Sequence, residues 1–334
     1  MQTRPVGNSE LEFSVIGLGT WAIGGGDWAF GWGPQDESEA IACVVRAVEL
    51  GVNWIDTAAV YGHGQSEKLV GKALKEISQS DRPLIATKCG RTTLSDGGIG
   101  KSLRKESVIA ECDASLQRLG VDVIDLYQMH WPEPDEEIEE GWQTLVDLKQ
   151  QGKVRCIGVS NHSVSQMQRL AKIHPITSLQ PPYSMMARDV ETEILPYCGQ
   201  ENIGVVAYSP MGKGMLTGAF DADRAKSLDQ TDHRSRDPRF QSPQLEINLS
   251  FVSKLGKIAD GLGWKLPELA IAWVMRRSEL TSAIVGTRHP KQIEQTVVAG
   301  TRVLDEASAA AIDQLLSERD AEIAALSGIQ QARV

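Results

Sequence analysis

The chain has 334 residues, of which 41% are hydrophobic, and its 34 basic and 44 acidic residues give a net charge of −10. This length suits one large α/β barrel or two ordinary domains, and the acidic balance argues against binding to nucleic acid or to an anionic membrane. No run of about 18 apolar residues occurs and the N-terminus lacks a signal-peptide pattern, so we expect no transmembrane helix and a cytoplasmic protein. Five scattered cysteines indicate free thiols in a reducing compartment: Cys43, Cys89, Cys112, Cys156 and Cys198.

The first segments combine a hairpin with a glycine-rich strand end. Residues 2–13 predict a hairpin, and residues 14–16 predict a first buried strand. The residues that follow, 17–22, read Gly-Leu-Gly-Thr-Trp-Ala and are similar to a dinucleotide-binding fingerprint. That fingerprint must open a helix, whereas residues 23–34 are too rich in glycine to begin one. We therefore expect these glycines to let the backbone lie close to a ligand.

Strand and helix patterns then alternate to the end of the chain. Further strands are predicted at residues 53–56, 84–87, 124–129, 154–159, 176–179, 203–207 and 282–285. Helices are predicted between and after them at about residues 36–50, 66–77, 105–119, 135–151, 163–173, 190–198, 249–262, 267–276, 290–299 and 305–326. The pattern predicts a (β/α)8 TIM barrel, with the N-terminal β-hairpin and a long polar loop at 212–242, as one domain over residues 1–334.

Four side chains follow three successive predicted strands, where the strand ends of a parallel barrel converge. They are Asp56, Tyr61, Lys88 and His130. A tyrosine hydroxyl has a pKa of about 10, and a nearby lysine is expected to lower it. A carboxylate would hold that lysine, and a histidine would orient a carbonyl oxygen. Alone, the aspartate suits a helix cap and the histidine a structural role, but the set in this order suits carbonyl reduction.

Several short segments, in this order, resemble the aldo-keto reductase family from about residue 10 to about residue 300. They include residues 17–21, 56–62, 86–88, 127–132, 157–161 and 207–212. The long segment after Ser209-Pro210 is similar to the bacterial branch that contains the inositol-operon and general-stress reductases. The resemblance implies that Asp56, Tyr61, Lys88 and His130 form a catalytic tetrad.

The resemblance also implies a nicotinamide cofactor, NADPH with NADH possible, held at the strand ends. The implied contacts are Gly19, Thr20, Trp21, Asp56, Ser160, Asn161, Gln180, Tyr208, Ser209, Pro210, Met211, Lys213, Leu216, Gly286, Thr287, Arg288, Gln292 and Gln295. Better-known eukaryotic members carry a lysine in place of Gly286 and an arginine in place of Gln292, and these bind the 2′-phosphate of NADP. Arg288 is the candidate substitute, because a guanidinium pairs bidentately with phosphate.

Aromatic residues in the loops at the same rim predict an apolar pocket for a small carbonyl substrate. With the tetrad members, the predicted pocket is Trp21, Trp28, Phe30, Trp32, Tyr61, His130 and Trp131. No cluster of Arg or Lys is evident there, which disfavours a sugar phosphate, and the six histidines lack zinc spacing, so no metal is expected.

Two other functions are compatible with these residues. One is a nucleotide-sensing regulatory subunit like the potassium-channel β subunits, and the other is an aldolase that uses Lys88 as a Schiff base. The complete set of four residues favours the reductase. We expect a monomer or weak homo-oligomer.

Overall fold

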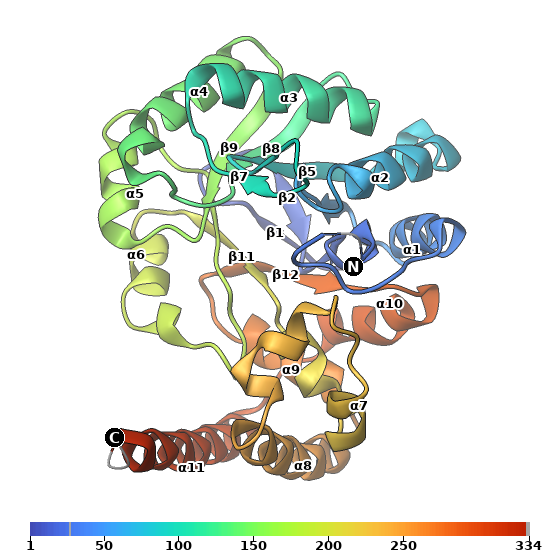
Figure 1. The fold of residues 1–334 in the computed structure, drawn as a ribbon, viewed down its shortest axis with the longest axis vertical. Coiled ribbons are helices and arrows are strands. Elements are labelled where there is room, and N and C mark those ends of the chain that lie inside the picture. Colours follow the sequence, from blue (N-terminus) through green and yellow to red (C-terminus); the bar gives the residue numbers. More distant parts are fainter. Residues whose placement is uncertain (27, 332–334) are drawn as a thin grey trace.

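Eight parallel strands close into a barrel in the computed structural model, which describes residues 1–26 and 28–331 (Figure 1). Each strand pairs with the next in parallel, and the last returns to the first through the pair Ala283–Ile16. The barrel strands are β3 (Ile16–Gly19), β4 (Trp54–Asp56), β5 (Leu84–Cys89), β8 (Ile124–Met129), β9 (Val154–Ser160), β10 (Ser178–Gln180), β11 (Gly204–Tyr208) and β12 (Leu280–Gly286). The predicted (β/α)8 barrel is confirmed.

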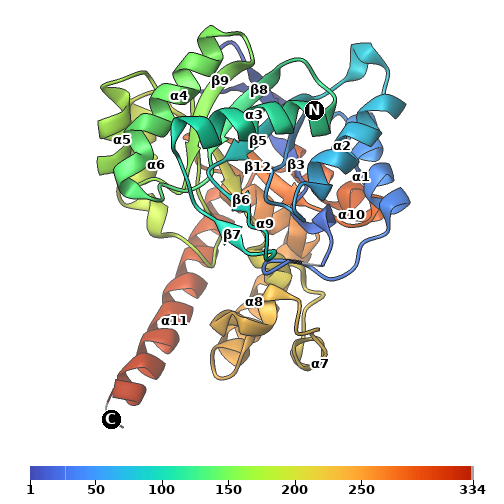
Figure 2. The same ribbon diagram turned by 45° about the horizontal axis from the view of Figure 1, so that its top comes forward.

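Helices surround the strands (Figure 1). The ring consists of α1 (Glu37–Glu49), α2 (Gln65–Glu76), α3 (Lys105–Leu119), α4 (Ile138–Gln150), α5 (Val164–Ala171), α6 (Ile194–Gln200), α9 (Leu266–Met275) and α10 (Pro290–Thr296). Helix α1 begins where the sequence predicts, because the Asp36 carboxylate accepts a hydrogen bond from the backbone N–H of Glu39. Helices α8 (Gln244–Leu262) and α11 (Glu306–Gln331) pack together outside the ring, and α11 extends away from the barrel (Figure 2).

The N-terminal hairpin closes the floor of the barrel. Its strands β1 (Thr3–Pro5) and β2 (Glu12–Ser14) are antiparallel, and the Phe13 ring stacks on the Trp54 indole at 4.2 Å between centroids. A Cβ atom on Gly17 would lie 2.2 Å from that indole. Gly17 therefore makes room for Trp54, and the expectation that both early glycines approach a ligand was wrong for this one. Gly19, two residues later, does line the cavity at the barrel mouth.

The connections at the mouth contain more structure than the sequence indicated. A small hairpin of β6 (Thr92–Thr93) and β7 (Ile99–Gly100) follows β5 and was not predicted. The polar segment 212–242 contains α7 (Ala222–Lys226) and the short 3-10 helices η5 (Gly212–Thr217), η6 (His233–Arg236) and η7 (Pro238–Phe240).

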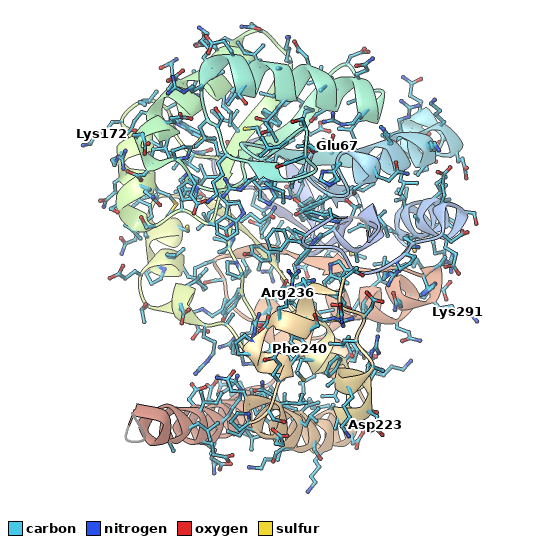
Figure 3. All side chains as sticks on the ribbon, viewed as in Figure 1. Glu67, Lys172, Asp223, Arg236, Phe240 and Lys291 are labelled. Carbon is cyan, nitrogen blue, oxygen red and sulfur yellow. The ribbon has the colours of Figure 1, made fainter. Side chains whose placement is uncertain are left out.

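Charged side chains are distributed over the outer surface of the barrel. Figure 3 labels Lys172 and Lys291 projecting from it, whereas Arg236 belongs to the segment at the mouth. Among the described residues, no helix combines the length and the apolarity needed to cross a membrane. The five cysteines are buried free thiols.

Candidate active site

The four residues of the predicted tetrad lie together at the barrel mouth. The Lys88 ammonium lies 2.8 and 2.7 Å from the two Asp56 carboxylate oxygens and 2.9 Å from the Thr57 carbonyl oxygen. It also lies 3.4 Å from the Tyr61 hydroxyl. The His130 ring faces the Tyr61 ring edge-on, with 5.8 Å between centroids. The ends of three strands thus bring a carboxylate, an ammonium group, an imidazole and a phenol together, as the spacing predicted.

Burial dominates the ionisation of this group. Desolvation raises the pKa of Tyr61 well above its usual value, and the nearby Asp56 carboxylate raises it further. The expectation that Lys88 would lower this pKa was wrong, because the Lys88 charge is paired with Asp56 and the phenolate would be out of water. Desolvation lowers the pKa of Lys88 and, more strongly, that of His130, which is therefore neutral at pH 7. Tyr61 is consequently protonated and suited to donating a proton.

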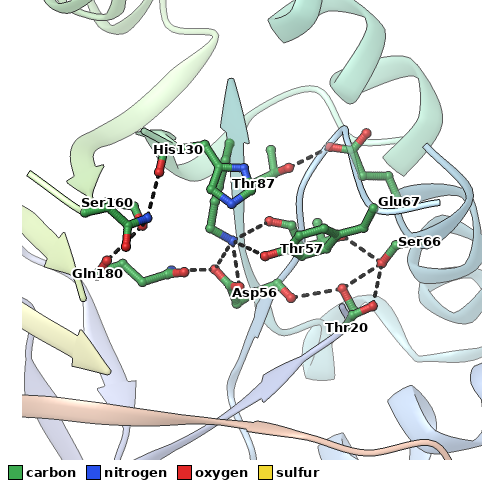
Figure 4. Close-up of polar contacts among 12 residues, drawn as sticks. Thr20, Asp56, Thr57, Ser66, Glu67, Thr87, His130, Ser160 and Gln180 are labelled. Carbon is green, nitrogen blue, oxygen red and sulfur yellow. Dashed lines mark hydrogen bonds and ion pairs between the residues drawn. The ribbon is translucent and has the colours of Figure 1, made fainter. Parts of the chain in front are cut away.

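Polar side chains from β9 to β11 extend the site along the mouth. The Gln180 side-chain amide donates to Asp56 at 2.7 Å (Figure 4). The Asn161 side-chain amide donates to the His130 carbonyl at 3.0 Å. The Tyr208 hydroxyl donates to the Asn161 side-chain oxygen at 2.9 Å. Asn161 is held in the left-handed region, with φ of 63°. These bonds connect the tetrad to the strand ends where the cofactor contacts were predicted.

A second buried network fixes strands β4 and β5 against helix α2. The Thr20 hydroxyl donates to the Asp56 carbonyl at 2.9 Å, and the Ser66 hydroxyl donates to Thr20 at 2.8 Å. The fully buried Glu67 carboxylate accepts from the Thr87 hydroxyl and from the Arg118 guanidinium, each at 2.6 Å. Because Thr87 precedes Lys88 on β5, this network holds the strand that carries Lys88, and Figure 4 shows Thr87 bonded to Glu67.

A cavity of about 1270 Å³ opens at the mouth beside the tetrad. Binding pockets for one small ligand are typically 300–1,000 Å³, so this cavity is larger than one small ligand requires. Its lining includes every predicted substrate-pocket residue and all the predicted cofactor contacts except Thr20 and Leu216. The structure places these two side chains elsewhere, because Thr20 belongs to the network behind the site and Leu216 packs in the core.

The cavity wall is strongly basic, although the chain as a whole is acidic. The lining cations are Arg91, Lys101, Lys213, Arg224, Arg234, Arg236 and Arg288, and the lining carboxylates are Asp56, Glu133 and Asp237. Most of these cations come from the segment 212–242, of which the sequence predicted only Lys213 at the site. Such a wall suits a ligand with several negative charges, as a dinucleotide has.

Arg288 ties strand β12 to the loop after β3. Its guanidinium donates to the carbonyl oxygens of Trp32, at 2.8 Å, and of Pro34, and to the Gln35 side chain at 2.9 Å. From the other side, Arg236 donates to the Ala29 carbonyl at 2.7 Å. The loop is therefore held by an arginine that follows β12 and by another in the segment 212–242. Arg288 lies at the cavity wall, where a phosphate would compete with these carbonyl groups.

Comparison with known proteins agrees with this architecture. A parallel barrel with a large cavity at the carboxyl ends of its strands is the form of a barrel enzyme. The sequence model of the Aldo/keto reductase family matches residues 15–317, and the chain belongs to this family. It is thus an NAD(P)H-dependent oxidoreductase. The resemblance deduced from the short motifs is confirmed.

Individual relatives are bacterial. The chain is 37% identical over 295 residues to aldo-keto reductase YhdN of Bacillus subtilis (strain 168), covering 88% of this chain and 87% of the relative. It is 33% identical over 322 residues to the NADH-specific methylglyoxal reductase of Escherichia coli (strain K12), covering 92% and 96%. Among solved structures, the glycerol dehydrogenase AKR11B4 from Gluconobacter oxydans is 34% identical with a TM-score of 0.86, and 95% of each chain is covered. The holo form of aldo-keto reductase AKR11C1 from Bacillus halodurans is 25% identical with a TM-score of 0.78, covering 94% and 96%.

Proposed function

We propose that this oxidoreductase reduces aldehydes and ketones to alcohols with NADPH, and that Tyr61 is the general acid. The observation that supports it most directly is the contact of the buried Lys88 ammonium with Asp56 and with the Tyr61 hydroxyl, two residues that line the cavity. The cofactor supplies hydride to the carbonyl carbon when bound. We further propose that residues 1–334 act as one domain, since the barrel uses strands from β3 to β12.

The chain's own groups supply the proton and orient the substrate. Tyr61 holds its proton through neutral pH because burial raises its pKa. It gives this proton to the carbonyl oxygen as negative charge develops there, and the Lys88 ammonium lies 3.4 Å from the hydroxyl oxygen that loses the proton. Neutral His130, edge-on to Tyr61, orients the same oxygen. Asp56 keeps Lys88 charged and in place.

Substitution of Tyr61 tests the acid. Tyr61→Phe removes the hydroxyl and keeps the ring, so kcat for 4-nitrobenzaldehyde should fall about 10²–10⁴-fold, the usual contribution of a general acid. NADPH affinity, followed by tryptophan fluorescence, should change little. Tyr197→Phe, on helix α6 away from the cavity lining, is the matched control. Turnover of Tyr61→Phe at the wild-type rate would eliminate Tyr61 as the proton donor.

The preference for NADPH rests on Arg288. Its guanidinium lies at the cavity wall, bound only to neutral carbonyl and amide oxygens among the contacts described above. One relative is named as NADH-specific, so the choice of cofactor needs its own test. Arg288→Met should raise the Kd for NADPH about tenfold or more and leave that for NADH nearly unchanged, because only NADPH carries the 2′-phosphate. Equal changes for both cofactors would contradict this assignment.

A further inference from the structure

The unpredicted hairpin forms the wall of the cavity on the tetrad side. Thr92 of β6 pairs with Gly100 of β7, so Arg91 and Lys101, the residues that flank this pair, meet at the base of the hairpin. Ile99 packs against the apolar cluster that contains Trp28 and Tyr61. The hairpin therefore brings two cations to the wall of the cavity that Tyr61 and His130 also line.

These two cations share one carboxylate. Arg91 Nη2 and Lys101 Nζ lie 2.7 and 2.8 Å from the same oxygen, Oε2, of Glu133. The other carboxylate that acts on Arg91 is the buried Glu111, and burial raises the pKa of Glu111 to about 7. The Arg91 side chain is only 10% exposed, and its guanidinium lies 5.8 Å from the centre of the Trp131 ring. Arg91 is thus held in place, and its charge is poorly screened by water.

Arg91 is also close to the reacting groups. It follows Lys88 by three residues at the end of β5, and Trp131 follows His130 directly at the end of β8. Its charge helps to lower the pKa of His130, after burial and Lys88. Arg91, Lys101, Tyr61 and His130 all line one cavity. A substrate whose carbonyl oxygen reaches Tyr61 would extend along Trp131 towards Arg91.

We propose that Arg91 and Lys101 form a subsite for a carboxylate, and that the preferred substrates are aldehydes carrying a carboxylate a few atoms from the carbonyl carbon. This inference rests on the proposed reductase function and specifies its substrate class. The aldehyde gains a hydride from the cofactor and a proton from Tyr61 and becomes a hydroxy acid, while its carboxylate is unchanged. A guanidinium binds a carboxylate with two parallel hydrogen bonds, which orients the substrate as well as attracting it. In this structure Arg91 Nη1 donates to the Gly90 carbonyl at 3.2 Å and Nη2 donates to Glu133 at 2.7 Å, so the substrate carboxylate would replace these partners.

A variant of Glu133 provides a second test of the subsite, with an expected effect opposite to that of a variant of Arg91. The Glu133 carboxylate already pairs with Arg91 and Lys101, so it competes with the substrate carboxylate for these two cations. Removing the Glu133 charge should strengthen binding of an acidic substrate, whereas removing the Arg91 charge should weaken it. The expectation that this rim lacks basic residues was wrong, because the cations are brought there by a hairpin and not by neighbouring positions in the sequence.

The experiment compares 4-formylbenzoate with its neutral methyl ester, which has the same reacting aldehyde. The measured quantity is the ratio of kcat/KM for the acid to kcat/KM for the ester. The wild type should favour the acid about tenfold or more. Arg91→Met should lower the ratio about tenfold, mainly through KM for the acid, and Glu133→Gln should raise it several-fold. Lys72→Met, which removes an exposed lysine paired with Glu37 on the outer surface, should leave the ratio unchanged.

The possible outcomes separate this inference from the function on which it rests. Reduction of the ester as fast as the acid by the wild type, or an unchanged ratio in Arg91→Met, would overturn the subsite and leave the reductase intact. A Glu133→Gln variant with a lower ratio would also overturn it. Reduction of neither compound, despite NADPH binding, would instead count against the proposed function.

Discussion

Replacing Asp56 with asparagine should destabilise the folded protein as well as reduce its activity. Asparagine keeps the shape and one oxygen acceptor, but it removes the negative charge 2.7 Å from Lys88, whose side chain has no exposed surface. Breaking a buried ion pair in this way costs roughly 3–5 kcal/mol. The alternative for Lys88 is to lose its proton. Relative to an unfolded lysine with a pKa of about 10.4, that costs about 1.4 kcal/mol per pH unit, or about 4.6 kcal/mol at pH 7.

The second estimate predicts a dependence on pH. The folded Asp56→Asn variant would hold Lys88 neutral, while the unfolded chain keeps it protonated until about pH 10.4. The unfolded state then binds more protons, so the free energy of unfolding rises with pH. The loss of stability relative to the wild type should therefore shrink by about 2.7 kcal/mol between pH 7 and pH 9.

Urea unfolding at pH 7, 8 and 9, followed by tryptophan fluorescence, measures this effect. The double variant with Lys88→Met removes both charges and should recover most of the stability, because apolar replacement of a buried pair is often neutral. A loss below about 1 kcal/mol at pH 7, or a loss that does not change with pH, would refute the view that Asp56 mainly compensates a buried charge.

Two further predictions concern the surroundings of the tetrad. Gly62 follows Tyr61 with φ of +57°, and a Cβ atom there would lie 1.8 Å from the Gly24 carbonyl oxygen. Gly62→Ala should therefore lower the Tm and the turnover, whereas Gly120→Ala, with φ of +67° and nothing within 4 Å, should cost only the roughly 1–2 kcal/mol of backbone strain. Burial lowers the pKa of His162 to about 4, so the unfolded state binds the extra proton between pH 4 and about 6.5, and the unfolding free energy should fall as pH drops through this range. His162→Gln should flatten this part of the stability curve, and an unchanged slope would show that His162 titrates normally.

The barrel and its tetrad were predictable because each rests on local signals. Alternating strand and helix patterns give the number of strands, and the carboxyl ends of parallel strands must meet at one rim. Asp56, Lys88 and His130 therefore needed only their positions at strand ends to be placed together. The ionisation of Tyr61 was not predictable in the same way. Its pKa depends on how completely the phenol is buried and on Asp56 having already paired with Lys88.

The basic wall of the cavity shows a different limit. Arg234, Arg236 and Arg288 are brought together by the path of a long segment with little periodicity, which sequence patterns do not determine. The hairpin that carries Lys101 had a usable signal, since Asp96-Gly97 is a common turn pair between short strands. Reading that turn would have placed Arg91 opposite Lys101. Thr20 was assigned to the cofactor because it follows Gly19, but its side chain turns towards Ser66.

The stacked Phe13 and Trp54 rings have a practical consequence for immobilising or labelling this protein. They seal the end of the barrel where the chain starts, and Met1 lies beside Gly51, which precedes the first residue of β4 by three positions. Reactants therefore exchange with solvent at the opposite end. An anchor or fluorescent reporter joined to Met1 would lie at the closed end of the barrel. Protein attached to a surface through Met1 should therefore keep the opening of its cavity accessible to substrate.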